Sequence, residues 1–202
     1  IPRPETELLV ELALEEARSK KQETSIIDIG TGSGNIIISL AKNLPDKNNF
    51  IAIDISKKAL QIARQNAKKH KIDRDIEFLR GDLLDPIIKN CSMLHAPCSI
   101  LILANLPYLS KEIYSATLPN VKKYEPKSAL FSPKEGLDHY EKLLKQISAL
   151  QKCYMFHATC YMEISPEQKA KLPKIIKKYL PRSKTSFHKD LAGKWRIARI
   201  EA

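Results

Sequence analysis

The stretch Ser25-Ile26-Ile27-Asp28-Ile29-Gly30-Thr31-Gly32-Ser33-Gly34-Asn35 decides the fold predicted for this chain. Its first five residues, three of them isoleucines, are typical of a buried strand, and the glycines that follow permit a tight turn. Helical spacing of apolar residues begins directly after the last glycine. A strand, a glycine-rich loop and a helix in this order predict an open α/β sheet with a ligand site at the loop.

The same alternation of strand and helix continues along the chain and predicts an α/β fold with a doubly wound sheet. Apolar runs predict seven strands, at 25–29, 50–54, 76–79, 100–104, 159–164, 185–188 and 195–200. Helical patterns cover 7–18, 35–42, a segment from the N-cap Ser56 to about His70, 137–150, and a segment from the N-cap Ser165 to 179–180 that bends at Pro173. We therefore expect a seven-stranded, mostly parallel sheet with an antiparallel C-terminal hairpin and helices on both faces.

Two acidic positions complete a predicted cofactor site beside the glycine loop. Asp54 ends the second strand, 54 − 34 = 20 residues after the last glycine, where a carboxylate can accept both hydrogen bonds of a ribose diol. The third strand leads to Asp82 and Leu83, where an acidic group can meet an adenine amino group. The G-x-G-x-G spacing favours S-adenosylmethionine over a nicotinamide cofactor. A glycine-rich turn that binds nothing is the alternative.

The tetrapeptide Asn105-Leu106-Pro107-Tyr108 follows the buried run at 99–104 and predicts the second half of the site. Pro107 lacks an N–H and holds Leu106 extended, so the carbonyls there cannot turn back into a helix. The Asn105 side-chain oxygen and a neighbouring carbonyl provide two acceptors, which suit a planar NH2 group, and Tyr108 provides a flat wall. This pattern indicates a site that holds an amide or amino nitrogen as a nucleophile. A simple turn at the end of the strand is the alternative.

Composition is consistent with one globular domain over 1–202. No apolar run approaches the roughly 20 residues of a membrane span, and no secretory signal is visible, so we expect a cytoplasmic protein with no membrane partner. The chain opens on Ile1-Pro2-Arg3-Pro4 rather than on Met, and we expect that a segment is missing upstream.

The net charge of +11 is concentrated towards the C-terminus. Residues 165–202 hold 11 basic and 3 acidic side chains, a net of +8. This basic region is either a contact surface for RNA or the ribosome or a solvated lysine-rich face.

The four cysteines fall into two C-x3-H-x2-C patterns, Cys91-His95-Cys98 and Cys153-His157-Cys160. Thiolates and imidazoles can bind zinc, but this spacing is not typical of a zinc site. We interpret them as reduced, unlinked thiols and expect no metal.

In order and spacing, these motifs resemble those of the HemK-type glutamine N5-methyltransferases, which modify peptide chain release factors. The resemblance covers nearly the whole chain and is carried by the following segments: Pro2 to Glu7, Asp28 to Gly34, Asp54, Gly81-Asp82, Asn105 to Tyr108, Tyr124-Glu125-Pro126, Ala129-Leu130, Gly136-Leu137, Tyr140, Glu163-Ile164, Gln168 and Asp190 to Arg196.

The resemblance implies a Rossmann-like class I methyltransferase that uses S-adenosyl-L-methionine to methylate the glutamine of a Gly-Gly-Gln loop in a release factor. It implies that the cofactor is bordered by Gly30, Thr31, Gly32, Ser33, Gly34, Asp54, Asp82, Leu83 and Asn105. It also implies that the substrate glutamine is held by Asn105, Leu106, Pro107 and Tyr108, the expected catalytic residues. The resemblance also implies an N-terminal helical substrate-recognition domain, which we expect to be absent from this chain.

Leu106 departs from the family pattern Asn-Pro-Pro-Tyr and is similar to the Asn-Leu-Pro-Tyr of ribosomal RNA adenine dimethyltransferases. The family uses the backbone carbonyl at this position, and leucine supplies one equally well. The alternatives are an adenine N6-methyltransferase acting on RNA or DNA, because an exocyclic NH2 fits the same site, and a ribosomal-protein glutamine as substrate. A non-catalytic docking module is the third.

Overall fold

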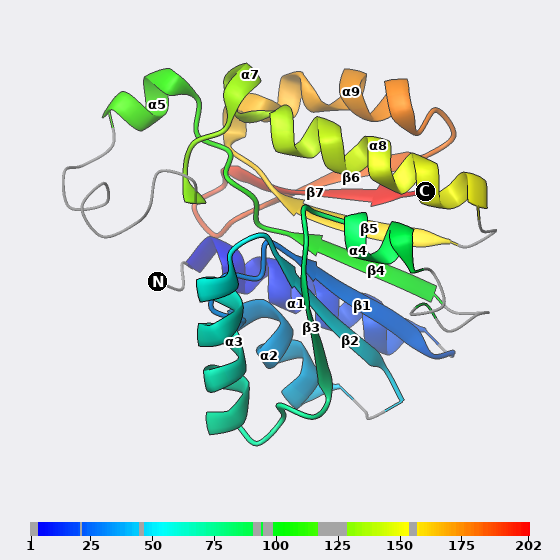
Figure 1. Ribbon diagram of the computed structural model, residues 1–202. Helices are drawn as coiled ribbons and strands as arrows, with labels where there is room; N and C mark the ends of the chain where they lie inside the picture. Colours follow the sequence, from blue (N-terminus) through cyan, green and yellow to red (C-terminus); the bar gives the residue numbers. More distant parts are fainter. Residues whose placement is uncertain are drawn as a thin grey trace.

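A computed structural model describes residues 4–20, 22–44, 47–90, 94, 99–116, 129–153 and 157–202. Within these ranges, seven strands form one sheet in the order β3-β2-β1-β4-β5-β7-β6 (Figure 1). All neighbouring strands pair in parallel except at β7, which runs antiparallel to both β5 and β6. The predicted seven-stranded sheet with an antiparallel C-terminal hairpin is therefore confirmed.

The predicted strands are all present and end within two residues of the predicted positions. Their bounds are β1 Thr24–Ile29, β2 Asn49–Asp54, β3 Ile76–Arg80, β4 Ser99–Ala104, β5 Ala158–Glu163, β6 Lys184–Lys189 and β7 Trp195–Glu201. The longer helices are α1 Pro4–Ser19, α2 Asn35–Asn43, α3 Lys57–Lys69 and α8 Asp138–Cys153. Ser56 caps α3 as predicted, with its side chain accepting from the Ala59 N–H at 3.2 Å.

The single bent helix predicted after Ser165 is wrong. The structure has a 3-10 helix, η3 Pro166–Ala170, followed by a separate helix, α9 Leu172–Tyr179. Pro173 lies in the first turn of α9, where its missing N–H costs nothing, so the proline starts a new helix instead of bending an old one. Among the described residues, three short helices were not predicted, because they are too short to show a period: α4 Asp85–Lys89, α5 Lys111–Ala116 and α7 Pro133–Gly136.

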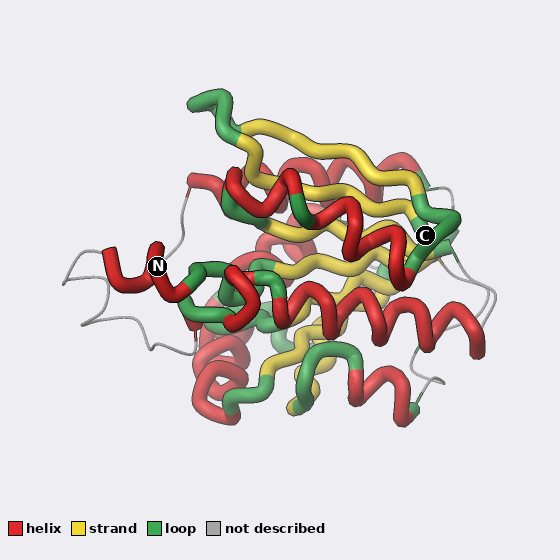
Figure 2. The backbone as a smooth tube through the Cα atoms, turned by 90° about the horizontal axis from the view of Figure 1, so that it is seen from above, coloured by secondary structure: helices red, strands yellow, loops and turns green. Residues whose placement is uncertain are grey.

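Helices cover both faces of the sheet. α1, α2 and α3 lie on one face, and α4, α8 and α9 lie on the other (Figure 1). Seen from above, the strands run side by side with the helices along them (Figure 2). Successive strand residues point to opposite faces, so Ile26 packs in the cluster under α1 and α2, and Ile27 packs in the cluster under α8 and α9.

The register of the parallel strands brings four chain segments to one edge of the sheet. Ile29 pairs with both Ile53 and Ala104, and Ala104 pairs with Met162. The residues that follow these positions therefore lie in one row at the carboxyl ends of the strands, and they are Gly30, Asp54, Asn105 and Glu163. Open α/β sheets bind their ligands at this edge. In the described part of the chain, no helix combines the length and the apolar character needed to cross a membrane.

Candidate active site

The glycine loop turns over the end of β2. The N–H groups of Gly30 and Thr31 both donate to the Ile53 carbonyl, at 2.8 and 3.0 Å. Gly30 has a φ of +69°, and a Cβ there would lie 3.0 Å from Leu106 Cδ2. This position requires a left-handed backbone conformation and also lies close to the Asn105 segment. Both requirements explain why a glycine is needed here.

Asp54 fastens this loop from the end of β2. One carboxylate oxygen accepts from the Gly32 N–H at 2.9 Å, and the other accepts from the Ser56 N–H at 2.8 Å. An ionised carboxylate offers about four acceptor positions, so Asp54 retains capacity for further hydrogen bonds from a ligand. The side chain also lines a cavity.

That cavity has a volume of about 470 Å³, which is within the usual range for a cofactor site. Its lining includes most of the residues predicted for the cofactor and the substrate amide: Gly30, Gly32, Asp54, Asp82, Leu83, Asn105, Leu106 and Pro107. α8 adds Asp138, His139 and Lys142, which were not predicted. The lining combines glycines with the three carboxylates of Asp54, Asp82 and Asp138, and these acceptors suit the hydroxyl and amino donors of S-adenosylmethionine.

Asp82 is not a free carboxylate in this arrangement. Its side chain forms an ion pair with Lys142 of α8, and both groups are partly exposed. Leu83 has a φ of +53° and is buried. The Leu84 N–H that follows donates to the Gln146 side chain at 2.9 Å, so α8 holds this turn in place. An adenine amino group at Asp82 would share the carboxylate with Lys142.

The Asn105 segment is held by side chains from distant parts of the sequence. Asn105 Nδ2 donates to Thr6 Oγ1 at 3.0 Å, and Thr6 Oγ1 donates to Glu163 Oε2 at 2.9 Å. The Tyr108 hydroxyl donates to Glu163 Oε1 at 3.2 Å. Tyr108 was predicted as a flat wall, and the structure adds a polar anchor for its ring. Glu163 is only 1 % exposed.

The Leu106 carbonyl was the second predicted acceptor. The Tyr140 hydroxyl lies 3.4 Å from it and also contacts the Glu163 carbonyl. Burial, and after it the negative charge of Glu163, raises the pKa of Tyr140 well above its usual range, so the hydroxyl keeps its single proton. That proton can serve only one acceptor at a time, and the Glu163 carbonyl is much the closer, so the Leu106 carbonyl retains acceptor capacity.

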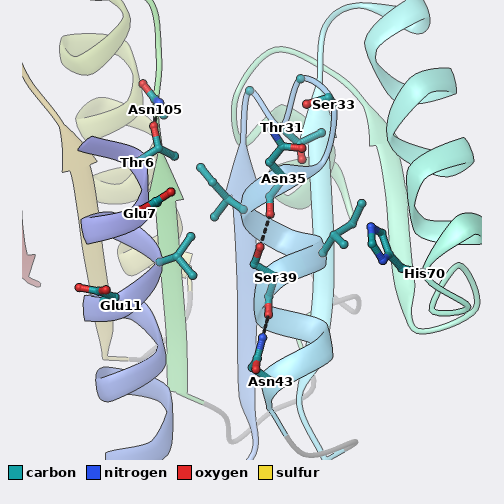
Figure 3. Close-up of a pocket in the computed structure, with 15 residues that line it drawn as sticks. Thr6, Glu7, Glu11, Thr31, Ser33, Asn35, Ser39, Asn43, His70 and Asn105 are labelled. Carbon is teal, nitrogen blue, oxygen red and sulfur yellow. Dashed lines mark hydrogen bonds between the residues drawn. The ribbon is translucent and has the colours of Figure 1, made fainter. Parts of the chain in front are cut away.

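A second cavity, of about 700 Å³, opens on the other side of Asn105, between α1 and α2. Gly30, Gly32 and Asn105 line both cavities, so Asn105 stands where the two meet. Figure 3 shows Asn105 beside Thr6, with Glu7 and Glu11 along α1 and the polar side chains Asn35, Ser39 and Asn43 along α2.

The structure brings most of the predicted site residues together but separates some of them. Thr31 and Ser33 line the cavity between α1 and α2 and not the smaller one. Gly34 is buried, lines neither cavity, and is the N-cap of α2. Tyr108 is likewise outside both linings and is tied to Glu163 instead. Two residues that connect the site, Thr6 and Glu163, belong to segments that carried the family resemblance, but no local pattern indicated their contacts.

Asp28 is a fully buried carboxyl group beneath the glycine loop. Burial raises its pKa to about 7, against the hydrogen bond from Thr31 Oγ1 at 2.6 Å, which lowers it. The negative charge of Asp54 adds a smaller increase. The folded protein therefore holds a proton on Asp28 at pH values where the unfolded chain has already lost it.

Replacing Asp28 by asparagine should remove this dependence of stability on pH. Because the folded-state pKa is above the unfolded value, the contribution of Asp28 is fully present below about pH 4 and is lost as the pH rises towards 7. Relative to the wild type, Asp28→Asn should gain about 2 kcal/mol between pH 5 and pH 7. Urea unfolding of both proteins at the two pH values measures it. Parallel changes in the two proteins would contradict the raised pKa.

Some predicted features lie outside the described residues, among them Cys91, His95, Cys98 and the segment Tyr124-Glu125-Pro126. Cys160 is buried in β5, and burial raises the pKa of its thiol to about 12, so it stays protonated. Within the part of the chain that is described, no three histidine, cysteine or acidic side chains gather as a metal site would require.

The strand order and the glycine loop, together with Asp54 at the end of β2, Asp82 after β3 and the Asn105 segment after β4, define a class I methyltransferase. A methyltransferase-domain family model matches residues 20–179. The release factor glutamine methyltransferase of Enterococcus faecalis is 34% identical over 201 residues, covering 100% of this chain and 67% of that protein. The enzyme of the same name from Streptococcus pneumoniae is 36% identical, covering 100% of this chain and 66% of that protein. The chain belongs to the release factor glutamine methyltransferase family.

Solved structures agree on the fold. The release-factor-specific protein-(glutamine-N5) methyltransferase of Alicyclobacillus acidocaldarius superposes with a TM-score of 0.55 at 22% identity, covering 100% of this chain and 93% of that one. The catalytic domain of hMettl16 in complex with a 3'UTR hairpin superposes with a TM-score of 0.70 at 15% identity, covering 100% of this chain and 71% of that one. The chain spans about two thirds of the length of the curated relatives it matches.

Proposed function

We propose that this chain transfers a methyl group from S-adenosyl-L-methionine to the side-chain amide nitrogen of a glutamine, the Gly-Gly-Gln glutamine of a peptide chain release factor. The observation that carries this proposal is the position of Asn105 between the two cavities, with its amide nitrogen bonded to Thr6. That bond directs the amide oxygen away from Thr6, where it can accept from a substrate N–H. Family membership selects a glutamine amide as the nitrogen.

The chemical difficulty of this reaction is the substrate nitrogen, because the lone pair of an amide is delocalised into its carbonyl. Bound S-adenosylmethionine would supply an electrophilic methyl group on a sulfonium sulfur. Asn105 Oδ1 and the Leu106 carbonyl would accept the two N–H bonds of the glutamine, orient its lone pair and favour positive charge on the nitrogen. Orientation of this kind can lower a barrier by up to roughly 7–11 kcal/mol.

The cofactor would lie in the smaller cavity. In this proposal, Gly30 and Gly32, the loop residues that line this cavity, approach its methionine part, Asp54 accepts from its ribose, and Asp82 and Leu83 meet its adenine. The carboxylate of Asp54 already orders the loop through Gly32, so one side chain would order the loop and bind the cofactor. Closing this site around the reacting groups would also exclude water.

In the adenine alternative, the same acceptors would bind the exocyclic NH2 group of the base. The fold alone does not discriminate between a glutamine and an adenine substrate, because the hMettl16 domain was solved with an RNA hairpin.

The basic region at 165–202 supports an RNA or ribosome contact. Its Lys169 and Lys189 ammonium groups lie 3.9 and 4.7 Å from the centre of the Trp195 ring. We propose that this region contacts RNA near the release factor, in the cytoplasm where translation ends.

One labelling experiment separates these functions. The protein is incubated with methyl-labelled S-adenosylmethionine and one of three acceptors: a release factor, the same factor with its Gly-Gly-Gln glutamine changed to alanine, or ribosomal RNA. We expect label only in the unmodified release factor. Label in the RNA would support the adenine alternative, and equal label in both release factors would exclude the proposed glutamine.

Leu106→Pro should keep activity close to normal, because proline supplies the same backbone carbonyl to the substrate. It should also lower stability by about 1–3 kcal/mol, since Leu106 is only 4 % exposed, packs in the core and contacts the Gly30 region. Turnover of the release factor and urea unfolding measure the two effects. A large loss of turnover in a folded variant would show that the leucine side chain, and not the carbonyl, is required.

A further inference from the structure

Glu163 is a carboxylate in an unusual place. It is the last residue of β5, it lies in the row of strand ends that forms the site, and it is 1 % exposed. A buried carboxylate is costly unless hydrogen bonds compensate it. Here both of its oxygens accept from side chains that belong to the site, Thr6 Oγ1 at 2.9 Å and the Tyr108 hydroxyl at 3.2 Å.

Two hydrogen bonds connect Asn105 to Glu163 through Thr6, and each has a defined donor and acceptor. Thr6 Oγ1 donates to Glu163 Oε2, and this bond uses the single proton of the hydroxyl. The Thr6 oxygen can then only accept from Asn105, and the Asn105 group that faces it must be the NH2, at 3.0 Å. The two ends of an asparagine amide have nearly the same shape, so shape alone does not choose between them.

We propose that Glu163 is a positioning residue that selects the orientation of the Asn105 amide, acting through Thr6, and holds the Tyr108 ring from the other oxygen. In the selected orientation, Asn105 Oδ1 faces the substrate and can accept from its NH2. In the reversed orientation, an NH2 group would face another NH2 group, and the substrate would lose an acceptor. The inference rests on the proposed function, in which the nucleophile is an NH2 nitrogen.

The backbone of the same segment is held separately. Gln168 Nε2 donates to the carbonyls of Tyr108, at 3.2 Å, and Gly136, at 2.9 Å, while its oxygen accepts from the Ser165 N–H at 3.0 Å. Because Gln168 fixes the main chain, a change at Glu163 should leave the course of the backbone intact. The property that Glu163 controls is then the orientation of the Asn105 amide, that is, which of its two ends faces the substrate.

Glu163→Gln tests the proposal with almost no change of shape. The new amide can donate a hydrogen bond to the Thr6 oxygen. The Thr6 hydroxyl is then free to donate to the Asn105 oxygen, so the Asn105 amide can flip to the reversed orientation. We expect kcat for release factor methylation to fall about 10²-fold, the size of effect seen when one polar contact to a reacting group is lost. The dissociation constant of S-adenosylmethionine should change less than about twofold, because Glu163 is outside the cofactor cavity.

Two substitutions at Thr6 give an independent test if Glu163→Gln does not fold. Thr6→Val keeps the shape and removes the hydroxyl that connects Glu163 to Asn105, so kcat should fall to a similar degree. Thr6→Ser restores a hydroxyl at the same position and should recover most of that loss. Equal activity of the two variants would overturn the proposal, because a packing role would not distinguish a hydroxyl from a methyl group in this way.

Glu16 provides a matched control. Like Glu163, this carboxylate accepts from one threonine and one tyrosine, Thr159 and Tyr161, each at 3.2 Å, but it lies outside both cavities. Glu16→Gln should lower stability through its lost contact with Arg199 and leave kcat unchanged.

NMR spectra of the free proteins give a second readout. The chemical shifts of the Asn105 side-chain NH2 group should change in Glu163→Gln and remain as in the wild type in Glu16→Gln.

The outcomes separate this inference from the proposed function. If the wild type labels the release factor and Glu163→Gln keeps more than half of its kcat, the inference is wrong and the function stands. If the wild type labels only RNA, the proposed glutamine substrate is wrong. In that case, a loss of RNA methylation in Glu163→Gln would still support the positioning role. Normal RNA methylation in this variant would refute both the inference and the proposed function.

Discussion

Asn105→Ala should lose at least about 10³-fold in turnover, the largest effect expected of any side-chain truncation in this protein. The substitution removes the oxygen that would accept from the substrate NH2 while the glycine loop and Asp54 remain. Cofactor affinity should be largely unchanged, because Asn105 is one residue among many that line the smaller cavity. Single-turnover methylation of the release factor and equilibrium binding of S-adenosylmethionine measure the two quantities.

Asn90→Ala is a suitable control for this experiment. Asn90 is an exposed asparagine at the end of α4 and lines neither cavity, so its truncation should leave turnover unchanged. Wild-type turnover in Asn105→Ala would refute the assignment of Asn105. A parallel loss of cofactor binding and turnover would instead show that Asn105 acts mainly on the cofactor.

Gly136→Ala should lower the free energy of unfolding by roughly 3–5 kcal/mol and also impair turnover. Gly136 has a φ of +83°, and a Cβ there would lie 1.9 Å from the Tyr108 carbonyl oxygen and 2.7 Å from Gln168 Nε2. The clash is with the main chain of the Asn105 segment, so relief requires movement of the segment that would hold the substrate. Urea unfolding and turnover of the same preparation measure both effects.

Gly193→Ala separates backbone strain from this clash. Gly193 has a similar φ of +76°, but none of the described atoms lies within 4 Å of a Cβ placed there. Its replacement should therefore cost only the strain of a left-handed residue, about 1–2 kcal/mol, and leave turnover intact. Equal effects of the two substitutions on stability and turnover would show that contact with Tyr108 is unimportant.

Local sequence patterns were sufficient to predict most of the sheet. Buried parallel strands such as 100–104 are continuous apolar runs, and residues such as Ser56 mark helix starts by side-chain chemistry that acts within one turn. Local patterns were insufficient where a helix is short or where a proline is compatible with two different structures. Pro173 can bend a helix or begin one, and the structure places it in the first turn of α9, which packs against α8.

The sequence by itself determined the strand–loop–helix unit around Gly30, the acidic end of β2, the Asn105 segment and, through their order and spacing, the family. These features depend on residues that are neighbours along the chain, so a linear pattern shows them. Tertiary structure alone decided that Thr6 and Glu163, which are 99 and 58 positions away from Asn105, join it in one hydrogen-bonded chain. The parallel register places strand ends from distant segments in one row, and contacts between side chains in that row leave no periodic trace in the sequence.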